Sequence, residues 1–347
     1  MRVVMLHGPG DLRVENHPAP VLPAGGLVVR TAYTGVCGSD VRNRIHGSAR
    51  LTGPQVPGHE MVGVIAESDD ARFPAGTDVA VCPGAPCGTC ADCRAGRANL
   101  CADRVVLGYD VPGGMAEAFA VPRGSLSAGC VVPLPEGLAL RPAVLSEPLH
   151  TVINGQDLAR VAAGDTVLVL GLGTIGTLHA AHALSLGAAR VLALDPRPER
   201  VAAAASVLGT GTVAELAPDD VAHLRAQAGA AGWSVVIVAA GAVAAVELAM
   251  EVVARSGRVL AFAGLPPGDA TVRIDANRIH YQQLELIGAF GGTPATYARA
   301  VAWLAASELH LGALVTHEFA IDDARAAYRN VEDGNGLKTV LRGPAAD

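Results

Sequence analysis

Four cysteines lie within fifteen residues of this chain, in the string CGTCADCRAGRANLC. They are Cys87, Cys90, Cys93 and Cys101. Thiolates spaced in this way on a tight, glycine-containing loop can converge on one tetrahedral zinc ion, with Zn–S bonds of about 2.3 Å. Because four protein ligands leave no open coordination position, we expect this zinc to be structural.

Two other arrangements also use closely spaced cysteines: a pair of disulfides and a [4Fe–4S] cluster. In the cluster motif three residues precede the fourth cysteine and a proline follows it, whereas seven residues separate Cys93 from Cys101 and an alanine follows. The chain opens MRVVMLHGPGDLRV, without a charged leader and a long apolar stretch. We therefore expect a cytoplasmic protein without disulfides, and the spacing favours zinc.

Length and composition exclude several classes of protein. A chain of 347 residues with 50% hydrophobic residues is expected to form two domains with large cores. It contains no uninterrupted apolar run of about 18 residues, so we expect no membrane span. A net charge of −7 offers no basic surface to nucleic acid. Lys338 is the only lysine, and the prevalence of arginine suggests a GC-rich coding genome more than a function.

The pattern of strands and helices changes near residue 150. Before it, short β-rich runs are bounded by glycine and proline: GGLVVRTAYTGV, MVGVIAE, DVAVCP and GGMAEAFAVP. This predicts an irregular antiparallel or barrel-like domain over residues 1–150, with the cysteine lobe at about 82–104. Over residues 151–290, apolar strands alternate with alanine-rich helices, which predicts an α/β domain with a parallel sheet. We expect residues 291–347 to return to the first domain.

The segment TVLVLGLGTIGTLHAAHALSLGAARVLALD carries a nucleotide-binding pattern. A buried strand, a GxGxxG turn and a long helix are followed by a second strand that ends in Asp195, 24 residues after Gly171. The glycines let a pyrophosphate approach the helix N-terminus. Asp195 would accept hydrogen bonds from ribose hydroxyls and repel a 2′-phosphate, which predicts NAD. The residues expected at this turn are Gly171, Gly173, Thr174, Ile175 and Gly176.

Two arginines follow Asp195 closely. Arg197 and Arg200 could accommodate the 2′-phosphate of NADP. Alternatively they are solvated charges at the start of the next helix, and we favour this interpretation. Arg200 remains a candidate contact of the cofactor.

Three further segments offer metal ligands of a different kind. TGVCGSD contains Cys37, VPGHEMVG contains His59 and Glu60, and SEPL contains Glu147. A thiolate, an imidazole and a carboxylate with one position left open make a catalytic zinc site. Taken singly, each residue also suits a structural role, because Cys37 could be a core thiol, His59 a satisfied loop histidine and Glu147 a helix-start charge.

These segments, together with the cysteine lobe, GLGTIG and the closing GLKTVLR, resemble the zinc-dependent medium-chain alcohol dehydrogenases. Within that family the chain resembles the sorbitol dehydrogenase-like, or polyol, branch. The likeness runs through nearly the whole chain in the correct order. It implies an α/β protein in which a GroES-like catalytic domain is split by a Rossmann domain with a doubly wound parallel sheet. It also implies a homo-oligomer, either a tetramer or a dimer.

The resemblance assigns roles to individual residues. Cys37 and His59 match the constant ligands of the catalytic zinc, and Glu147 matches the glutamate of the polyol branch. Glu60 matches a carboxylate that binds the metal directly or through water. Ser39 resembles the hydroxyl that receives the proton of the alcohol. Two zinc ions per chain, one catalytic and one structural, are therefore expected.

The chain departs from the family at the end of the proton path. Many relatives carry a histidine five residues after the zinc cysteine, where this chain has Arg42. A guanidinium with a pKa above about 12 cannot serve as the terminal base. His46, which has a counterpart in the sorbitol branch, could take the proton, although it also suits a loop histidine at the edge of the site. Glu60 offers another route.

The resemblance implies hydride transfer between NAD and a polar secondary alcohol to give a ketone. The substrate classes are polyols, sugars, cyclitols or aminocyclitols, and amino alcohols. An aromatic content of only 3% agrees with a polar cleft. Two alternatives remain: a zinc-free NADPH quinone or enoyl reductase of the same fold, and a zinc-stapled nucleotide-binding protein without catalysis. The remaining cysteines, Cys82 and Cys130, are expected to be buried in the core.

Overall fold

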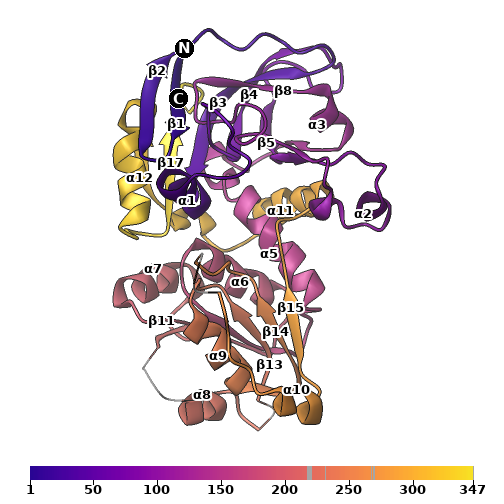
Figure 1. Ribbon diagram of the computed structural model, residues 1–347, viewed down its shortest axis with the longest axis vertical. Helices are drawn as coiled ribbons and strands as arrows, with labels where there is room; N and C mark the ends of the chain where they lie inside the picture. The colour runs from indigo at the N-terminus through magenta and orange to yellow at the C-terminus, as the bar shows by residue number, and fades with distance from the viewer. Residues whose placement is uncertain (217–220, 231, 267, 269, 347) are drawn as a thin grey trace. The chain divides into compact units, whose positions relative to one another are not determined.

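The computed structural model describes all residues except 217–220, 231, 267, 269 and 347. The chain forms two compact units, one made of residues 1–150 and 292–347 and the other of residues 151–291 (Figure 1). Both ends of the chain therefore build the first unit, and the middle builds the second. Within the described residues, no helix is both long enough and apolar enough to cross a membrane.

The first unit is rich in short strands. Its strands are β1 (Arg2–Gly8), β2 (Asp11–Asn16), β3 (Leu27–Val36), β4 (Glu60–Ser68), β5 (Asp78–Val81), β6 (Gly84–Ala85), β7 (Val105–Val106), β8 (Ala118–Val121), β9 (Val131–Pro133), β16 (Val315–Ala320) and β17 (Lys338–Arg342). Its helices are α1 (Gly38–His46), α2 (Ala91–Arg94), α3 (Arg123–Ser127), α4 (Leu140–Ala143), α11 (Pro294–Ala306) and α12 (Ala324–Glu332), with 3-10 turns at Ala98–Leu100, Leu311–Leu314 and Ile321–Asp323. Helix α5 (Ser146–Leu158) begins in this unit and ends in the other.

Strand β3 organises the main sheet of the first unit. The strand order is β16-β17-β3-β4-β5-β9, and β8 also pairs with β3. Every residue of β3 except Arg30 is buried, which explains its nearly continuous apolar sequence. Gly35 on β3 lies opposite Glu60 on β4 and Val340 on β17. The last strand of the chain, yellow in Figure 1, is thereby hydrogen-bonded beside β3, where β4 begins.

The second unit contains one parallel sheet. Its strands are β10 (Thr166–Leu170), β11 (Arg190–Asp195), β12 (Val213–Glu215), β13 (Trp233–Val238), β14 (Val253–Ala261) and β15 (Glu285–Gly288). Its helices are α6 (Thr174–Ser185), α7 (Pro198–Leu208), α8 (Val221–Gln227), α9 (Val243–Val252) and α10 (Ala276–Gln282). The order β12-β11-β10-β13-β14-β15, with every pair parallel, confirms the predicted doubly wound sheet.

The order of the strands in this sheet reverses beside β10. Chain order runs outward from β10 through β11 to β12 on one side, and from β13 to β15 on the other. Ligands of open α/β sheets bind at the carboxyl ends of the strands where the order reverses. The GxGxxG turn follows β10 directly, so the fold places it at this position.

Candidate active site

Three of the predicted metal ligands converge in the first unit. Cys37 follows the last residue of β3 and caps the N-terminus of α1, while His59 and Glu60 stand at the start of β4. One ligand atom from each of the three lies within 4.8 Å of the others. The antiparallel register of β3 and β4 pairs Gly35 with Glu60, and this pairing brings together segments that are more than twenty residues apart in sequence.

A buried aspartate supports two of these ligands. Asp40 is 2% exposed and accepts a hydrogen bond from the Cys37 backbone N–H at 2.9 Å. Its other carboxylate oxygen lies 3.4 Å from His59 Nδ1. Burial lowers the pKa of His59, but the Asp40 carboxylate and the Cys37 sulfur outweigh burial and raise it well above its ordinary value. Metal binding here would therefore release protons, because the ligating imidazole must be neutral.

Asp40 is absent from the residues predicted above. The available signal was its place three residues after Cys37, where an acidic side chain can reach back to the N-cap backbone of a helix. In this structure the same carboxylate lies against the candidate ligand His59, where a carboxylate usually stands behind a metal site.

Lys338 forms an ion pair with Glu60, and both side chains are at least 95% buried. Burial lowers the pKa of Lys338, whereas the Glu60 carboxylate raises it, and the net shift is upward. Gly35 makes this pair possible, because a Cβ at that position would meet Glu60 Oε2 at 1.7 Å and Lys338 Cε at 2.8 Å. The prevalence of arginine over lysine indicates no function for Lys338, but the fold gives this residue one partner. Lys338 is the buried counter-charge of a candidate metal ligand.

Glu147 lies outside the group of three that approach within 4.8 Å. It stands in the first turn of α5, at the predicted helix start. Burial raises its pKa to about 7; His59 opposes the shift, while the negative charge of Glu60 adds to it. Glu147 thus shares the electrostatic environment of the site, and Glu60 is the carboxylate closer to Cys37 and His59.

A thiolate, an imidazole and carboxylates form a donor set suited to zinc. Cys37 has intermediate exposure, whereas His59 and Glu60 are buried, so these donors lie at the edge of the core.

The two predicted proton-transfer residues on α1 differ in their surroundings. Ser39 Oγ lies 3.4 Å from His59 Nε2, which places the hydroxyl beside the candidate metal ligands. His46, the last residue of α1, is exposed and makes no hydrogen bond or ion pair within the part of the chain that is described. The structure thus brings Ser39, but not His46, into contact with a metal-ligand side chain.

The four cysteines of the lobe also converge. Their sulfur atoms lie within 4.8 Å of one another, and all seven cysteines of the chain are free thiols. Backbone N–H groups of Thr89 and Cys90 donate to the Cys87 sulfur and lower its pKa to about 6, which favours the thiolate that a metal requires. The residues fit a closed zinc site. Cys82 and Cys130 lie outside both groups and are buried, as predicted.

The turn that follows β10 in the second unit requires glycine at two positions. Gly171 adopts φ +106°, a conformation that favours glycine, and a Cβ on Gly176 would meet the Gly171 carbonyl oxygen at 1.7 Å. Gly173 caps the N-terminus of α6, which begins at Thr174 and continues through Ile175. The first backbone N–H groups of a helix have no partner within it, so this turn can hold a phosphate.

Asp195 ends β11 and is 3% exposed. Its carboxylate accepts hydrogen bonds from the backbone N–H groups of Leu172 at 2.8 Å and Arg197 at 3.0 Å. Arg200 Nη1 lies 3.6 Å from the carboxylate, and Arg197 Nε lies 3.8 Å from it. Both arginines are thus paired with Asp195, and their description as merely solvated charges was wrong. Through its hydrogen bond with the Leu172 N–H, Asp195 connects the glycine turn to the end of β11.

Comparisons with known proteins agree with this geometry. Residues 23–136 match the alcohol dehydrogenase GroES-like domain, and residues 174–306 match the zinc-binding dehydrogenase domain. The chain belongs to the zinc-dependent alcohol dehydrogenase family. Its GroES-like and Rossmann domains account for the strand-rich unit and the parallel sheet described above.

Two curated relatives of this dehydrogenase cover nearly its whole length. One is named Probable D-xylulose reductase A, from Arthroderma otae, and is 33% identical over 98% of this chain and 96% of that protein. Another is 2-dehydro-3-deoxy-L-galactonate 5-dehydrogenase from Pseudoalteromonas atlantica, 31% identical over 94% of each chain. A solved structure described as a zinc-binding dehydrogenase from Sinorhizobium meliloti 1021, bound to NADP, is 27% identical, with a TM-score of 0.89 over 98% of both chains.

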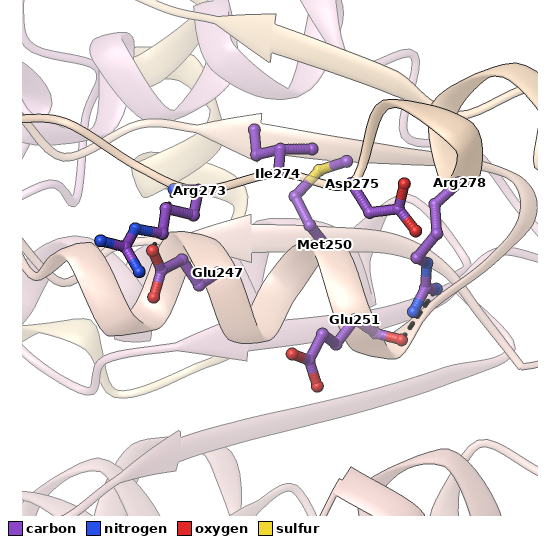
Figure 2. Close-up of a pocket in the computed structure, with 7 residues that line it drawn as sticks. All are labelled: Glu247, Met250, Glu251, Arg273, Ile274, Asp275 and Arg278. Atoms are coloured by element: carbon purple, nitrogen blue, oxygen red, sulfur yellow. Dashed lines mark hydrogen bonds between the residues drawn. The ribbon is translucent and has the colours of Figure 1, made fainter.

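The dehydrogenase also has a pocket in its second unit that contains none of the predicted site residues. Its volume is about 390 Å³, and it lies between α9 and the start of α10 (Figure 2). Arg278 Nη2 donates to the backbone oxygen of Glu251 at 3.0 Å, and the Arg273 backbone N–H donates to Glu247 at 2.9 Å. These bonds join the walls of the pocket, and we assign it no part in the reaction.

Proposed function

We propose that this dehydrogenase transfers hydride between NAD and a polar secondary alcohol, giving a ketone. The observation that carries the proposal is the convergence of Cys37, His59 and Glu60 within 4.8 Å, in a chain that also contains a nucleotide-binding glycine turn. A zinc-free reductase of the same fold would not require a thiolate, an imidazole and a carboxylate in one place.

The candidate ligands and the charged residues beside them have different roles in this proposal. Cys37 and His59, with Glu60 or Glu147, would hold a zinc ion, which when bound polarises the substrate oxygen and lowers the pKa of the hydroxyl. Asp40 orients the imidazole of His59. The positive charge of Lys338 compensates the negative charge of Glu60. It thereby reduces the electrostatic repulsion among Cys37, Glu60 and Glu147. The cysteine lobe would hold the second, structural zinc.

Proton movement starts at Ser39 in this proposal. Its hydroxyl stands beside His59 and is placed to accept the proton that the alcohol loses. Arg42 is exposed and permanently charged, so it does not act as the terminal base. Glu60 is another route for the proton, one that needs no histidine on α1. His46 is a second route, at the exposed end of that helix.

The substrate class rests on charge and on the names of relatives. Carboxylates beside the candidate metal ligands favour an alcohol with several polar groups over an aliphatic one. The two curated relatives named above are called a xylulose reductase and a deoxygalactonate dehydrogenase, and both names denote polyhydroxylated compounds. We infer that a polyol, a sugar, a cyclitol or aminocyclitol, or an amino alcohol is the substrate.

An NAD+-coupled screen tests this function. Polyols, cyclitols, amino alcohols and simple secondary alcohols are compared at equal concentration, while bound zinc is measured in the same preparation. We expect turnover of at least one polar class and little turnover of monohydric alcohols. Activity confined to hydrophobic alcohols would contradict the substrate class. Nucleotide binding without turnover of any alcohol would contradict the enzyme assignment.

Asp195 is expected to set the preference for NAD. Replacing Asp195 with asparagine keeps an acceptor for the Leu172 N–H but removes the charge that repels a 2′-phosphate. We expect the ratio of kcat/KM for NAD+ to that for NADP+ to fall by about 10- to 100-fold, the usual effect of losing a charged hydrogen bond. Steady-state kinetics with both cofactors measures it.

The control for this variant is Glu215→Gln on β12. Glu215 is exposed and lies directly beside Asp195 in the sheet register, so it tests the loss of any nearby negative charge. We expect its cofactor ratio to change less than twofold. A wild-type enzyme that prefers NADP+ would contradict this interpretation of Asp195.

The second unit also supports a homo-oligomer. Within the described residues β15 pairs only with β14, so its other edge is open. Leu286 on this strand is 45% exposed. Phe290, two residues after the end of the strand, is 62% exposed. An open edge with exposed apolar side chains favours pairing with a second copy. The apolar strand GRVLAFAGL lies in β14, which is paired on both sides, so β15 is the better candidate. Sedimentation measures the oligomeric state.

A further inference from the structure

Tyr109 lies beside the candidate metal ligands, although no motif drew attention to it. The centre of its ring is 5.7 Å from that of His59, and the two planes are tilted by 49°. Gly108, at φ +86°, brings the backbone so close to Gly58 that a Cβ would meet the Gly58 carbonyl oxygen at 2.9 Å. This close approach of residues 58 and 108 holds the Tyr109 ring against the imidazole.

Tyr109 also lines a cavity of about 520 Å³ in the same unit. Residues 49–55 form one wall of the cavity, and Tyr109 and Asp110 form the other. The walls are joined by hydrogen bonds. Gln55 Nε2 donates to the Tyr109 carbonyl at 3.1 Å, and Arg50 is paired with Asp110 and donates to the Arg104 carbonyl at 3.0 Å. The two walls of the cavity are therefore held together by polar groups.

The phenol hydroxyl of Tyr109 differs from its neighbours in this wall. It makes no hydrogen bond with any residue in the described part of the chain, whereas Arg50, Gln55 and Asp110 are all paired. The ring itself is half-buried against His59. A site that can hydrogen-bond a substrate hydroxyl discriminates strongly against an analogue that lacks it, because the polar group of the site then stays unpaired.

We propose that Tyr109 is a specificity-determining residue, whose hydroxyl binds a hydroxyl or amino group of the substrate beyond the reacting carbon. The inference rests on the proposed function, and it assigns the cavity of residues 49–55 to the remote part of a polar alcohol. The ring packs against the imidazole of His59 at a tilt of 49°, and Tyr109 adds no ligand atom to the group of Cys37, His59 and Glu60. Tyr109 therefore affects which alcohol is bound, and not the chemistry at the reacting carbon.

Tyr109→Phe tests this role, because it removes one oxygen atom and keeps the ring on His59. The probes are xylitol, sorbitol and myo-inositol as polar substrates, and 2-butanol as a monohydric alcohol. For the polyol that the wild-type enzyme oxidises best, we expect kcat/KM to fall about tenfold, through KM, as for the loss of one hydrogen bond. For 2-butanol, measured at high concentration, we expect a change of less than twofold.

Tyr281→Phe is the matched control. Tyr281 lies on α10 of the second unit and is 71% exposed, so the same change there should leave both substrates unaffected. Bound zinc and the thermal midpoint are measured for each variant. Tyr109→Leu, which also removes the ring, should lower kcat/KM for the polyol at least as far as Tyr109→Phe.

The results of these experiments distinguish a failure of the Tyr109 role from a failure of the proposed function. An equal loss on xylitol and 2-butanol, or no loss on either, would overturn the role of Tyr109 and leave the proposed function intact. If the wild-type enzyme oxidised 2-butanol but no polyol, the proposed substrate class would fail, and the role of Tyr109 would fail with it. Loss of polyol oxidation alone, with zinc retained, is the result that supports the inference.

Discussion

Replacing Cys37 with serine should abolish turnover and remove the catalytic zinc while leaving the structural zinc in place. A serine hydroxyl is a poor zinc ligand at neutral pH, and only His59 and the carboxylates would remain. Losing the polarisation of the substrate oxygen costs several kcal/mol of transition-state stabilisation, so we expect kcat/KM to fall by about 1,000-fold or more. Metal analysis by mass spectrometry and steady-state kinetics measure the two effects.

Cys82→Ser is the matched control for this variant. Cys82 is a buried thiol of the same unit that belongs to neither ligand group, so both zinc ions and most of the activity should be kept. Retention of full zinc content and turnover by Cys37→Ser would refute the assignment of the catalytic metal. Loss of all zinc from Cys37→Ser would show instead that the two sites are not independent.

Replacing Lys338 with methionine should lower the free energy of unfolding more than the same replacement at an exposed ion pair. It leaves the Glu60 carboxylate, 1% exposed, without its counter-charge. Removing one partner of a buried ion pair typically costs about 3–5 kcal/mol of unfolding free energy. Urea denaturation followed by circular dichroism, with zinc content checked, measures the loss. A second substitution, Glu60→Gln, removes the stranded charge, so the double variant should recover much of the stability.

The control for Lys338 is Arg160→Met. Arg160 forms an ion pair with Glu285 in which both side chains are about half exposed, and such pairs contribute less than about 1 kcal/mol. If Lys338→Met were no more destabilising than Arg160→Met, the buried pair would not be needed for stability. If the double variant were less stable than Lys338→Met, the uncompensated charge on Glu60 would not be the cause of the loss.

Much of the architecture could be predicted because its signals are local. The strand, glycine turn and helix around Gly171 are contiguous, and each element follows from the periodicity and turn chemistry of its own residues. The four-cysteine lobe is equally local, since Cys87 to Cys101 span one short segment. The ion pairs of Arg197 and Arg200 with Asp195 are also local, but they depend on side-chain directions that the sequence pattern does not specify.

By itself, the sequence predicted two groups of candidate zinc ligands, the glycine turn and the fold class, because these depend on residue type and short spacing. Only the tertiary structure decided which carboxylate stands nearest Cys37 and His59, since that follows from the register of β3 with β4. It also gave Lys338 its partner, because β17 joins β3 from more than 300 residues away along the chain. Tyr109 likewise reached His59 through the close approach of two glycines, a contact that no linear pattern encodes.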